Sequence, residues 1–346
     1  MLTIYTDTHL RHATASVRTE GDLLITEEVP ARAEIIVAAV RAAGFGPVQP
    51  PDDFGRAPLL AVHAPDYVDF LETLYAKNAA YYQTGGPVFG STFAPRGALH
   101  KPAGYLGQVG YYAFDVGSPV LEGTWDAAYA SAQCALTAAA RVRAGEPVAY
   151  ALCRPPGHHA AQAMFGGYCY LNNAAIAARW LQAQVSRVAV LDVDYHHGNG
   201  TQSIFYADPQ VLTCSLHADP DEDYPFYWGG AAERGEGPGQ GCNHNWPLPL
   251  GTDDARYLAT LTEALAVIRA YAPAVLVVSV GFDTALGDPV GGFTLTPGGL
   301  AAVGDAIADL GLPTVLVQEG GYRLDMLAEN STAFLRAFAD RASIAG

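Results

Sequence analysis

The chain has 346 residues, half of them hydrophobic, with 19 Lys or Arg against 35 Asp or Glu and a formal net charge of −16. This apolar content excludes a disordered or fibrous protein, and the apolar runs are too short to span a bilayer. The acidity argues against nucleic acid as a partner, because phosphate binding needs a basic surface. A cationic ligand would suit the charge, although solubility alone explains the net charge more simply.

The chain begins directly on a strand-like pattern at Met1–Ile4, without the basic start and apolar stretch of a secretory leader. We therefore expect a cytoplasmic protein with no membrane partner. The five cysteines are scattered and include no Cys-x-x-Cys pair: Cys134, Cys153, Cys169, Cys214 and Cys242. Such a set is typical of reduced thiols and not of a disulfide framework or a thiolate zinc site.

Short apolar runs rich in β-branched residues alternate with helical patterns, and neither an internal repeat nor a low-complexity tract divides the chain. In chain order, the predicted strands are Leu59–His63, Val148–Leu152, Val188–Val193, Val211–Leu216, Val275–Val280 and Thr314–Gln318. The predicted helices are Ala31–Ala43, Ala127–Ala144, Asn173–Leu181, Asp254–Tyr271 and Pro297–Leu310. This alternation indicates one doubly wound α/β domain over residues 1–346, with a mostly parallel sheet and helices on both faces.

Unusual polar residues follow four of the predicted strands, and in such sheets ligands bind beyond the carboxyl ends of the strands. These segments are Arg154–His159, Asp192–Gly200, Gly281–Asp283 and Gln318–Tyr322. We therefore expect their His, Asp and Tyr side chains to face a common crevice.

A metal site is predicted from two of these segments. Asp194 and His196 are two residues apart, so on an extended strand end their side chains project to the same side. Asp283 can add a third ligand from another strand. Two carboxylates and an imidazole suit Zn²⁺ with an open position for water, or Fe²⁺ in the same cage. Alone, the Asp-x-Asp-x-His-His motif is more simply a capped strand end, but the polar groups at the other strand ends favour the metal site.

The pair His158-His159 follows Pro155-Pro156-Gly157, a segment stiffened by its prolines. The two imidazoles could be metal ligands, part of a buried turn, or proton carriers. We interpret them as proton carriers, because the Asp₂His set already supplies three ligands. Asp192 is placed to accept a hydrogen bond from one of them, which would fix its tautomer and raise its basicity.

Tyr322 follows Gly320-Gly321, which allows the backbone to turn sharply. A phenol beside a metal can donate a hydrogen bond to the oxyanion that develops in amide hydrolysis. The alternative is a core tyrosine after a turn. We expect Glu319 to be a structural hydrogen-bonding group at its strand end.

Taken together, these segments resemble the arginase/deacetylase superfamily, and within it the zinc-dependent histone deacetylases and, more closely, the bacterial acetylpolyamine amidohydrolases. The resemblance rests on Arg154–His159, Phe165–Cys169, Asp192–Gly200, Ser215–His217, Gly281–Asp283 and Glu319–Tyr322, in matching order over most of the chain. It implies the arginase/deacetylase fold and a hydrolase of acetylated amines.

The resemblance also implies roles for particular residues. One Zn²⁺ per chain would be held by Asp194, His196 and Asp283. His159 would be the general base that later protonates the leaving amine, and His158, backed by Asp192, would assist through the water at the metal. Tyr322 would polarise the scissile carbonyl.

Further sites are implied by the same resemblance. Gly167 and Tyr168 would line a narrow tunnel, with Tyr224 on its opposite wall. A structural monovalent cation, usually K⁺, would lie close to the zinc. Its shell would be Asp192, Asp194, His196, Ser215 and Leu216, in part through backbone oxygens.

Two long irregular segments, 83–104 and 218–245, interrupt the helix–strand alternation, and such loops are usually lids or partner contacts. The first resembles an insertion that in the acetylpolyamine amidohydrolases packs across a dimer and narrows the active-site mouth; Thr92–Arg96 look like that segment. We therefore expect a homodimer and a small, slender substrate.

The sequence departs from the related families in two places. Asn199 stands where histone deacetylases carry an Asp behind the second histidine, which predicts a less basic His159. This amide is usual in the polyamine branch.

The second departure lies near the expected mouth. Leu106 and Gly117 occupy positions where the polyamine enzymes place acids that bind the distal ammonium. Asp115, Glu122 and the acidic loop Asp219–Asp223 are nearby in sequence and could substitute.

The leading hypothesis is therefore an amidohydrolase for small cationic acetylated amines, with acetylputrescine and acetylcadaverine first and acetylated spermidine or spermine next. Deacetylation of acetyl-lysine, of acetylated proteins or of another small amide stays open. The rivals are a ureohydrolase with two Mn²⁺ ions and a non-catalytic protein that binds acetylated amines.

Overall fold

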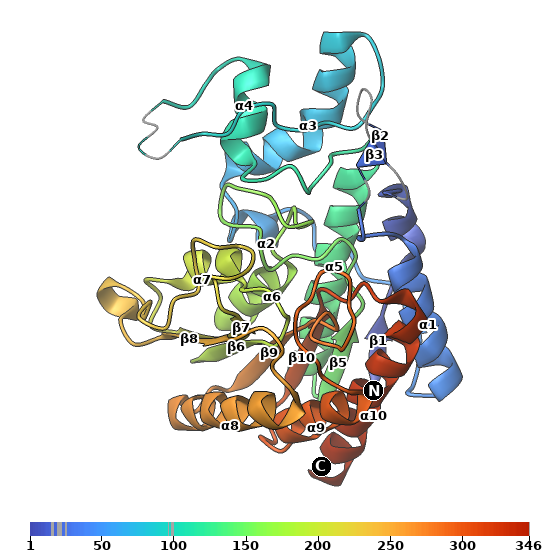
Figure 1. The fold of residues 1–346 in the computed structure, drawn as a ribbon, viewed down its shortest axis with the longest axis vertical. Coiled ribbons are helices and arrows are strands. Elements are labelled where there is room, and N and C mark those ends of the chain that lie inside the picture. The colour runs from blue at the N-terminus through green and yellow to red at the C-terminus, as the bar shows by residue number, and fades with distance from the viewer. Residues whose placement is uncertain (15–16, 19–22, 25, 96, 98–99, 346) are drawn as a thin grey trace.

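The computed structural model describes residues 1–346 except 15–16, 19–22, 25, 96, 98–99 and 346. Within this part of the chain, eight strands form one sheet in the order β4-β1-β5-β10-β9-β6-β7-β8, and all its neighbours run parallel (Figure 1). The strands are Leu2–Ile4 (β1), Val48–Gln49 (β4), Val148–Ala151 (β5), Val188–Asp192 (β6), Val211–Ala218 (β7), Asn243–Leu248 (β8), Val275–Val280 (β9) and Thr314–Gln318 (β10). A separate antiparallel pair joins Val17–Arg18 (β2) to Leu23–Leu24 (β3).

Helices cover both faces of the sheet. One face carries Ala57–Leu60 (α2), Pro65–Tyr82 (α3), Tyr105–Tyr112 (α4), Thr124–Arg143 (α5), Asn173–Gln182 (α6) and Asn199–Phe205 (α7). The other face carries Ala31–Ala43 (α1), Asp254–Tyr271 (α8), Pro297–Ala308 (α9) and Leu324–Ala345 (α10). Two short 3₁₀ helices lie at Asp7–Arg11 and Gly237–Gly239. The doubly wound α/β architecture with a parallel sheet is thus confirmed.

The two helical layers explain why the central strands are apolar throughout. Val277 points into the core on the α5–α6 side of the sheet, while its neighbours Leu276 and Val278 point into the core on the α8–α10 side. Because successive side chains alternate between faces and both faces are covered, every position of β9 is buried.

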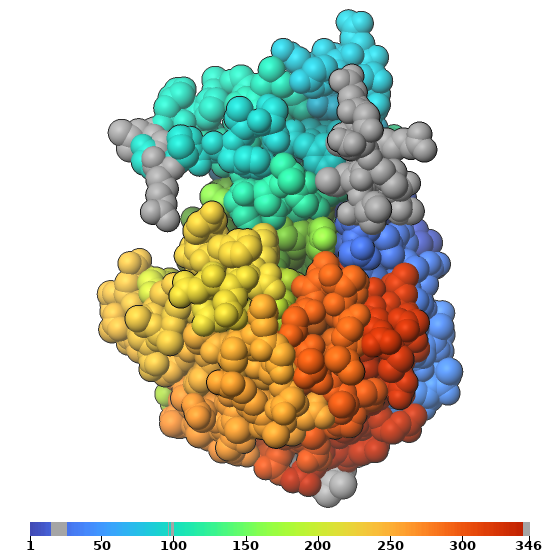
Figure 2. All heavy atoms as spheres, viewed as in Figure 1, coloured from blue at the N-terminus to red at the C-terminus, as the bar shows by residue number. Residues whose placement is uncertain are grey.

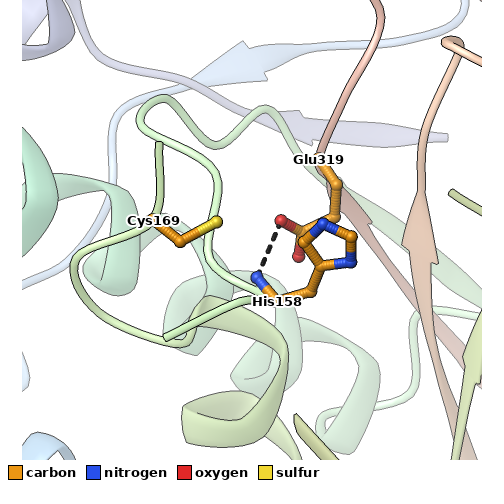
Figure 3. Close-up of side chains that lie close together, drawn as sticks. All are labelled: His158, Cys169 and Glu319. Atoms are coloured by element: carbon orange, nitrogen blue, oxygen red, sulfur yellow. Dashed lines mark hydrogen bonds between the residues drawn. The ribbon is translucent and has the colours of Figure 1, made fainter. Parts of the chain in front are cut away.

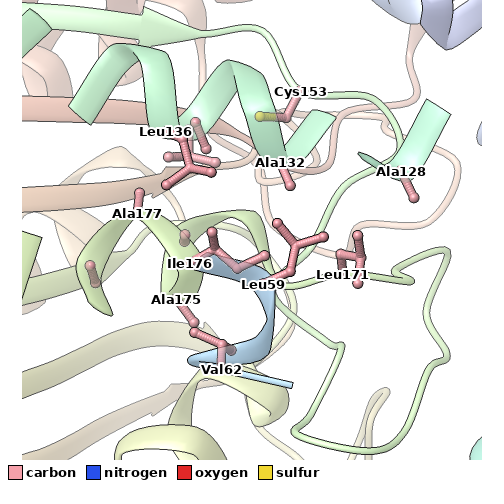
Figure 4. Close-up of a cluster of buried hydrophobic side chains, with 14 of the residues drawn as sticks. Leu59, Val62, Ala128, Ala132, Leu136, Cys153, Leu171, Ala175, Ile176 and Ala177 are labelled. Atoms are coloured by element: carbon pink, nitrogen blue, oxygen red, sulfur yellow. The ribbon is translucent and has the colours of Figure 1, made fainter. Parts of the chain in front are cut away.

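The α5–α6 layer packs closely because its contact residues are small. Ala132 of α5 and Ala175 of α6 lie in the cluster that Figure 4 shows, with Leu59 and Val62 inserted beside them. The prediction of a strand over Leu59–His63 is therefore wrong. A short buried apolar run fits a helical turn as well as a strand, and here it forms α2 and the turn that follows.

The loop expected over residues 218–245 is shorter in the structure, because β8 begins at Asn243 and forms the edge of the sheet. Its first residues, Asn243, His244 and Asn245, lack the apolar pattern of the central strands. Helices α3, α4, α7 and α10 were also outside the predicted set, while the helices that were predicted lie within a few residues of the observed bounds.

The 83–104 segment is largely irregular, apart from an isolated antiparallel bridge between Val88 and Val120. The Ala94 amide donates to the Gly110 carbonyl, which ties the segment to α4. Arg96, part of the predicted dimer segment, lies outside the described residues. No helix among the residues described here combines the length and the apolar character that crossing a membrane requires.

Gly304 of α9 offers a test of the helix packing on the second face. A Cβ atom at this position would lie 2.5 Å from the Phe334 carbonyl oxygen of α10. Gly304→Ala should therefore lower the free energy of unfolding by about 1–3 kcal/mol through overpacking, measured by urea denaturation. The matched control is Gly298→Ala in the same helix, whose Cβ would approach nothing closer than 3.5 Å and which should be neutral or slightly stabilising. Equal stability of the two variants would contradict this account.

Candidate active site

Three predicted metal ligands meet at the carboxyl ends of two adjacent strands. Asp194 and His196 follow β6, and Asp283 follows β9, with one ligand atom from each within 4.8 Å of the others. The Nδ1 of His196 lies 3.3 Å from Asp194 Oδ1 and 3.1 Å from Asp283 Oδ2. The second oxygen of each carboxylate accepts a backbone hydrogen bond, from Gly320 N to Asp194 and from Tyr195 N to Asp283. The remaining oxygens and the imidazole therefore face a common point.

The charges at this point fit a cation. Burial and the neighbouring charge of Asp194 raise the pKa of Asp283 to about 7. Burial opposes charge on His196, but hydrogen bonds to Asp194 and Asp283 outweigh it and raise its pKa to about 10. Two buried carboxylates this close repel each other unless a positive charge lies between them. Two carboxylates and one imidazole nitrogen are also ligands that Zn²⁺ accepts.

The paired histidines have different partners. His158 Nδ1 lies 3.0 Å from Asp192 Oδ2, whereas His159 Nδ1 lies 2.7 Å from Asn199 Oδ1. The predicted Asp192–imidazole contact is therefore present, and it belongs to His158. A charged partner and an amide partner give these two adjacent imidazoles unlike environments.

The partners separate the basicities of the two imidazoles. Burial disfavours charge on both, but Asp194 and Asp192 outweigh it at His158 and raise its pKa to about 10. At His159, burial and the positive charges of His158 and His196 hold the pKa well below its ordinary value. His159 is thus neutral at neutral pH, the state in which an imidazole accepts a proton.

A second group of metal-ligating side chains, His158, Cys169 and Glu319, lies buried beside the first (Figure 3). Glu319 Oε2 accepts hydrogen bonds from the amides of Gly157 and His158, which joins the end of β10 to the loop after β5. Burial raises the pKa of the Cys169 thiol well above its ordinary value, and its sulfur donates to the Gly167 carbonyl. A protonated thiol is a poor metal ligand, and Glu319 serves as a hydrogen-bonding group at its strand end, as expected.

Tyr322 is buried and lines the same cavity as His159 and His196. Its ring lies under the Arg32 guanidinium, 4.3 Å from Cζ to the ring centroid. Its backbone amide donates to Asp288, 2.7 Å away. These contacts hold the phenol at the crevice, where the sequence placed it.

No sequence motif indicates the residues that hold the backbone of Glu319–Tyr322 in place. Arg32 donates to the Glu319 and Gly321 carbonyls, and to Glu28 at 2.9 Å. Glu28 also accepts from Arg154, at 2.8 and 3.0 Å, so one buried carboxylate is shared by two buried arginines. Burial would raise the pKa of Glu28, but Arg154 and Arg32 outweigh it and lower the pKa. Only the Glu–Arg spacing of four residues could have suggested this pair from sequence.

Arg154 extends the same network to the start of the chain. Its guanidinium donates to the backbone carbonyls of His9 and His12, at 2.8 and 2.9 Å. The loop that carries His158 and His159 is thereby fixed at its base.

A cavity of about 580 Å³ opens beside the candidate metal ligands. Its lining residues are Asp115, Gly117, His159, Gly167, Tyr168, His196, Asp223, Tyr224, Leu250, Pro289, Val290, Gly291, Gly292 and Tyr322. The structure thus brings the predicted wall residues Gly167, Tyr168 and Tyr224 to one cavity with the candidate metal site. In Figure 2, the yellow segment after β7 lies directly beneath cyan and teal atoms of the α3–α4 region.

The two walls are joined by Asp115, whose Oδ2 accepts from Gly167 N and from the Tyr224 hydroxyl, both at 2.7 Å. Gly167 has φ 56°, and a Cβ there would lie 2.2 Å from His159 Cδ2. Glycine is therefore required for the wall to approach the imidazole. Asp115 lines the cavity, as expected, but its carboxylate is hydrogen-bonded to both walls.

The other residues considered for the cavity mouth differ in whether they line the cavity. Gly117 and Asp223 line the cavity, whereas Leu106 and Glu122 are exposed and do not. Within the acidic loop Asp219–Asp223, only the last residue belongs to the lining.

The residues predicted for a monovalent cation lie at the ends of β6 and β7. The register pairs Asp192 with Ser215, and both line a small void of about 10 Å³, roughly the volume of one water-sized sphere. Ser215 Oγ also contacts His217 Nδ1 at 2.7 Å, and Leu216 is buried.

Residues 26–338 match the model of the histone deacetylase domain family. The chain is 46% identical over 343 residues to "Acetylpolyamine amidohydrolase 1" of Pseudomonas aeruginosa, covering 98% of this chain and 99% of that protein. It is 41% identical over 332 residues to "Acetylpolyamine amidohydrolase" of Mycoplana ramosa, covering 95% and 97%. The crystal structure of the acetylpolyamine aminohydrolase from Burkholderia pseudomallei superimposes with a TM-score of 0.92 at 46% identity, covering 98% of each chain.

A doubly wound sheet that gathers such a site at its strand ends, together with these matches, defines a hydrolase that acts on amides. The chain belongs to the histone deacetylase domain family.

Metal analysis tests the candidate ligands. If these residues bind a divalent ion, Asp194→Ala should purify without it, because one of the three candidate ligands is removed, whereas His159→Ala should retain one ion per chain. The measurement is elemental analysis of purified, dialysed protein, with circular dichroism to verify folding. A full metal content in Asp194→Ala, or metal loss in His159→Ala, would reverse the assignment.

Proposed function

We propose that this protein is a zinc-dependent amidohydrolase that removes acetyl groups from small cationic acetylated amines. The observation that carries the proposal is the placement of Asp194, His196 and Asp283 at a cavity that His159 and Tyr322 also line. Membership in the histone deacetylase domain family supports amide hydrolysis. The full-length relatives named as acetylpolyamine amidohydrolases support the class of substrate.

The donor set described above fits a single Zn²⁺ ion held by Asp194, His196 and Asp283. When bound there, Zn²⁺ would polarise the amide carbonyl and make a water molecule more acidic. The protein's own side chains then supply the proton transfers and stabilise the developing charge.

His159 is the general base and later the general acid. Its lowered pKa keeps the imidazole neutral, so it can take the proton of the attacking water and pass it to the leaving amine. Asn199 orients this ring without adding negative charge. His158, with its raised pKa and its contact to Asp192, assists electrostatically beside the attacking water.

Tyr322 donates a hydrogen bond to the oxyanion of the tetrahedral intermediate. Burial raises the pKa of its phenol well above the ordinary value, so the hydroxyl keeps its proton and remains a donor. Arg32 and Asp288 hold the residue in place and act only through its position.

The substrate fits an aromatic passage with an acidic outer part. Tyr168 and Tyr224 can cover an alkyl chain, while the ammonium stays in the field of the cavity carboxylates. Acetylputrescine and acetylcadaverine are the leading substrates, and longer acetylated polyamines come next. A structural K⁺ near Asp192 and Ser215 belongs to the same proposal, supported by their shared void.

A cytoplasmic homodimer formed around residues 83–104 completes the proposal. It is supported by large apolar side chains that are exposed within this segment or close to it in sequence: Tyr81, Tyr82, Phe93 and Leu106. In this arrangement residues 1–346 form a single catalytic domain.

A dinuclear ureohydrolase is the closest rival, and it needs a second set of metal ligands. In the described part of the chain, the only other candidate group contains Cys169, whose raised pKa disfavours metal binding. A metal content of one ion per chain separates the two proposals.

Acetate release from acetylputrescine is the direct test of the function. The protein should release acetate, lose this activity to a chelator and regain it with Zn²⁺, because a bound Zn²⁺ would activate both the amide and the water. An acetyl-lysine peptide in the same assay should react more slowly, since the passage favours a slender substrate. A protein that binds acetylputrescine without releasing acetate would instead be a binding protein.

Tyr322→Phe tests the oxyanion donor. The variant should keep its metal and lose about 10²–10³ in kcat, equivalent to about 3–4 kcal/mol, because one oxyanion donor is removed. Its kcat and metal content should be measured on the same preparation. Undiminished turnover would show that the Tyr322 hydroxyl does not stabilise the transition state.

A further inference from the structure

The candidate active-site cavity has two acidic side chains in its lining besides the residues of the candidate metal site. Asp115 and Asp223 line it, and no Lys or Arg is among the lining residues in the described part of the chain. Arg32, the guanidinium closest to the Tyr322 ring, is occupied by Glu28 and two backbone carbonyls. The cavity therefore favours a ligand with a positive group, which either Asp115 or Asp223 could bind.

Asp115 has little capacity left. Its two oxygens accept hydrogen bonds from Gly117 N at 2.9 Å and from Gly167 N and the Tyr224 hydroxyl at 2.7 Å. A carboxylate offers about four lone-pair positions, so most of them are already used within the protein. Asp115 is a positioning residue that joins the two walls.

Asp223 has more capacity. Oδ2 accepts from the Tyr195 hydroxyl at 2.5 Å, and Oδ1 accepts from the backbone amide of Tyr224 at 2.7 Å. Each oxygen thus keeps a lone pair for a ligand. The side chain lines the cavity and is half-buried, whereas Asp194 and Asp283 are fully buried, so Asp223 lies nearer to solvent than the candidate metal ligands do.

Tyr195 sets the distance between this carboxylate and the reaction centre. Its backbone amide donates to Asp283, and its hydroxyl donates to Asp223. The side chain of one tyrosine therefore separates Asp223 from a candidate metal ligand. A chain of four or five methylenes between an amide nitrogen and an ammonium spans a comparable length.

We propose that Asp223 binds the distal ammonium of the acetylated amine and makes the enzyme prefer a cationic amide to a neutral one. The inference rests on the proposed function and assigns its substrate-recognition residue. It also explains how a chain with Leu106 and Gly117 at the expected acidic positions can recognise a diamine. The ammonium gains charge-assisted hydrogen bonds that a methyl group cannot form.

The test compares acetylputrescine with N-pentylacetamide, in which a methyl group replaces the ammonium. Wild type should show a higher kcat/KM for acetylputrescine, and Asp223→Asn should reduce the ratio of the two values about ten- to hundredfold, as expected for a hydrogen bond to a charged group. Asp223→Glu retains the charge and should keep most of the ratio. The matched control is Asp221→Asn, an exposed acid of the same loop outside the cavity lining, which should leave the ratio unchanged.

The outcomes separate the two proposals. If wild type releases acetate from neither amide, the proposed function fails and the inference fails with it. If wild type cleaves both but Asp223→Asn keeps the full ratio, only the inference is overturned. An equal fall of kcat/KM for both substrates in Asp223→Asn, with the ratio unchanged, would make Asp223 merely structural and would also overturn it.

Discussion

The site depends on the parallel pairing of β6 with β9. Their register places Asp192 opposite Ser279, so both strands end at the same edge and send Asp194 and Asp283 to one point. Two buried carboxylates repel each other, and the sheet holds them together through the packing of its apolar strands rather than through any attraction between them. The favourable packing of the apolar strands thus compensates the electrostatic repulsion between the two carboxylates, and a bound cation would reduce that repulsion.

The parts of this arrangement that follow from local pattern could be predicted from sequence. The apolar runs of β6, β9 and β10 indicate buried parallel strands, and the polar residues after them indicate ligands at the strand ends. The turn at Leu59–His63 could not be recognised, because a short apolar run does not distinguish a strand from a buried helix. The edge strand at Asn243–Leu248 was hidden by its polar first half.

Contacts between distant residues set the rest of the site and leave no local pattern. Asp115 reaches Tyr224 across 109 residues, and Arg32 reaches Gly321 across 289. Neither pair has a spacing that sequence periodicity can detect. The choice of Asp223 from several nearby acids was likewise possible only once the cavity lining was known.

The buried network around Arg154 has a consequence for acid tolerance. Burial, together with the positive charge of Arg154, lowers the pKa of His9 to about 4 and that of His12 to about 3. Both imidazoles are neutral in the folded chain but bind protons near pH 6.5 once unfolded, so the unfolded chain takes up more protons on acidification. The native state therefore loses stability progressively from about pH 6.5 downward. His9 and His12, whose backbone carbonyls bind Arg154 at the base of the loop with His158 and His159, thus make the folded protein less stable in acid.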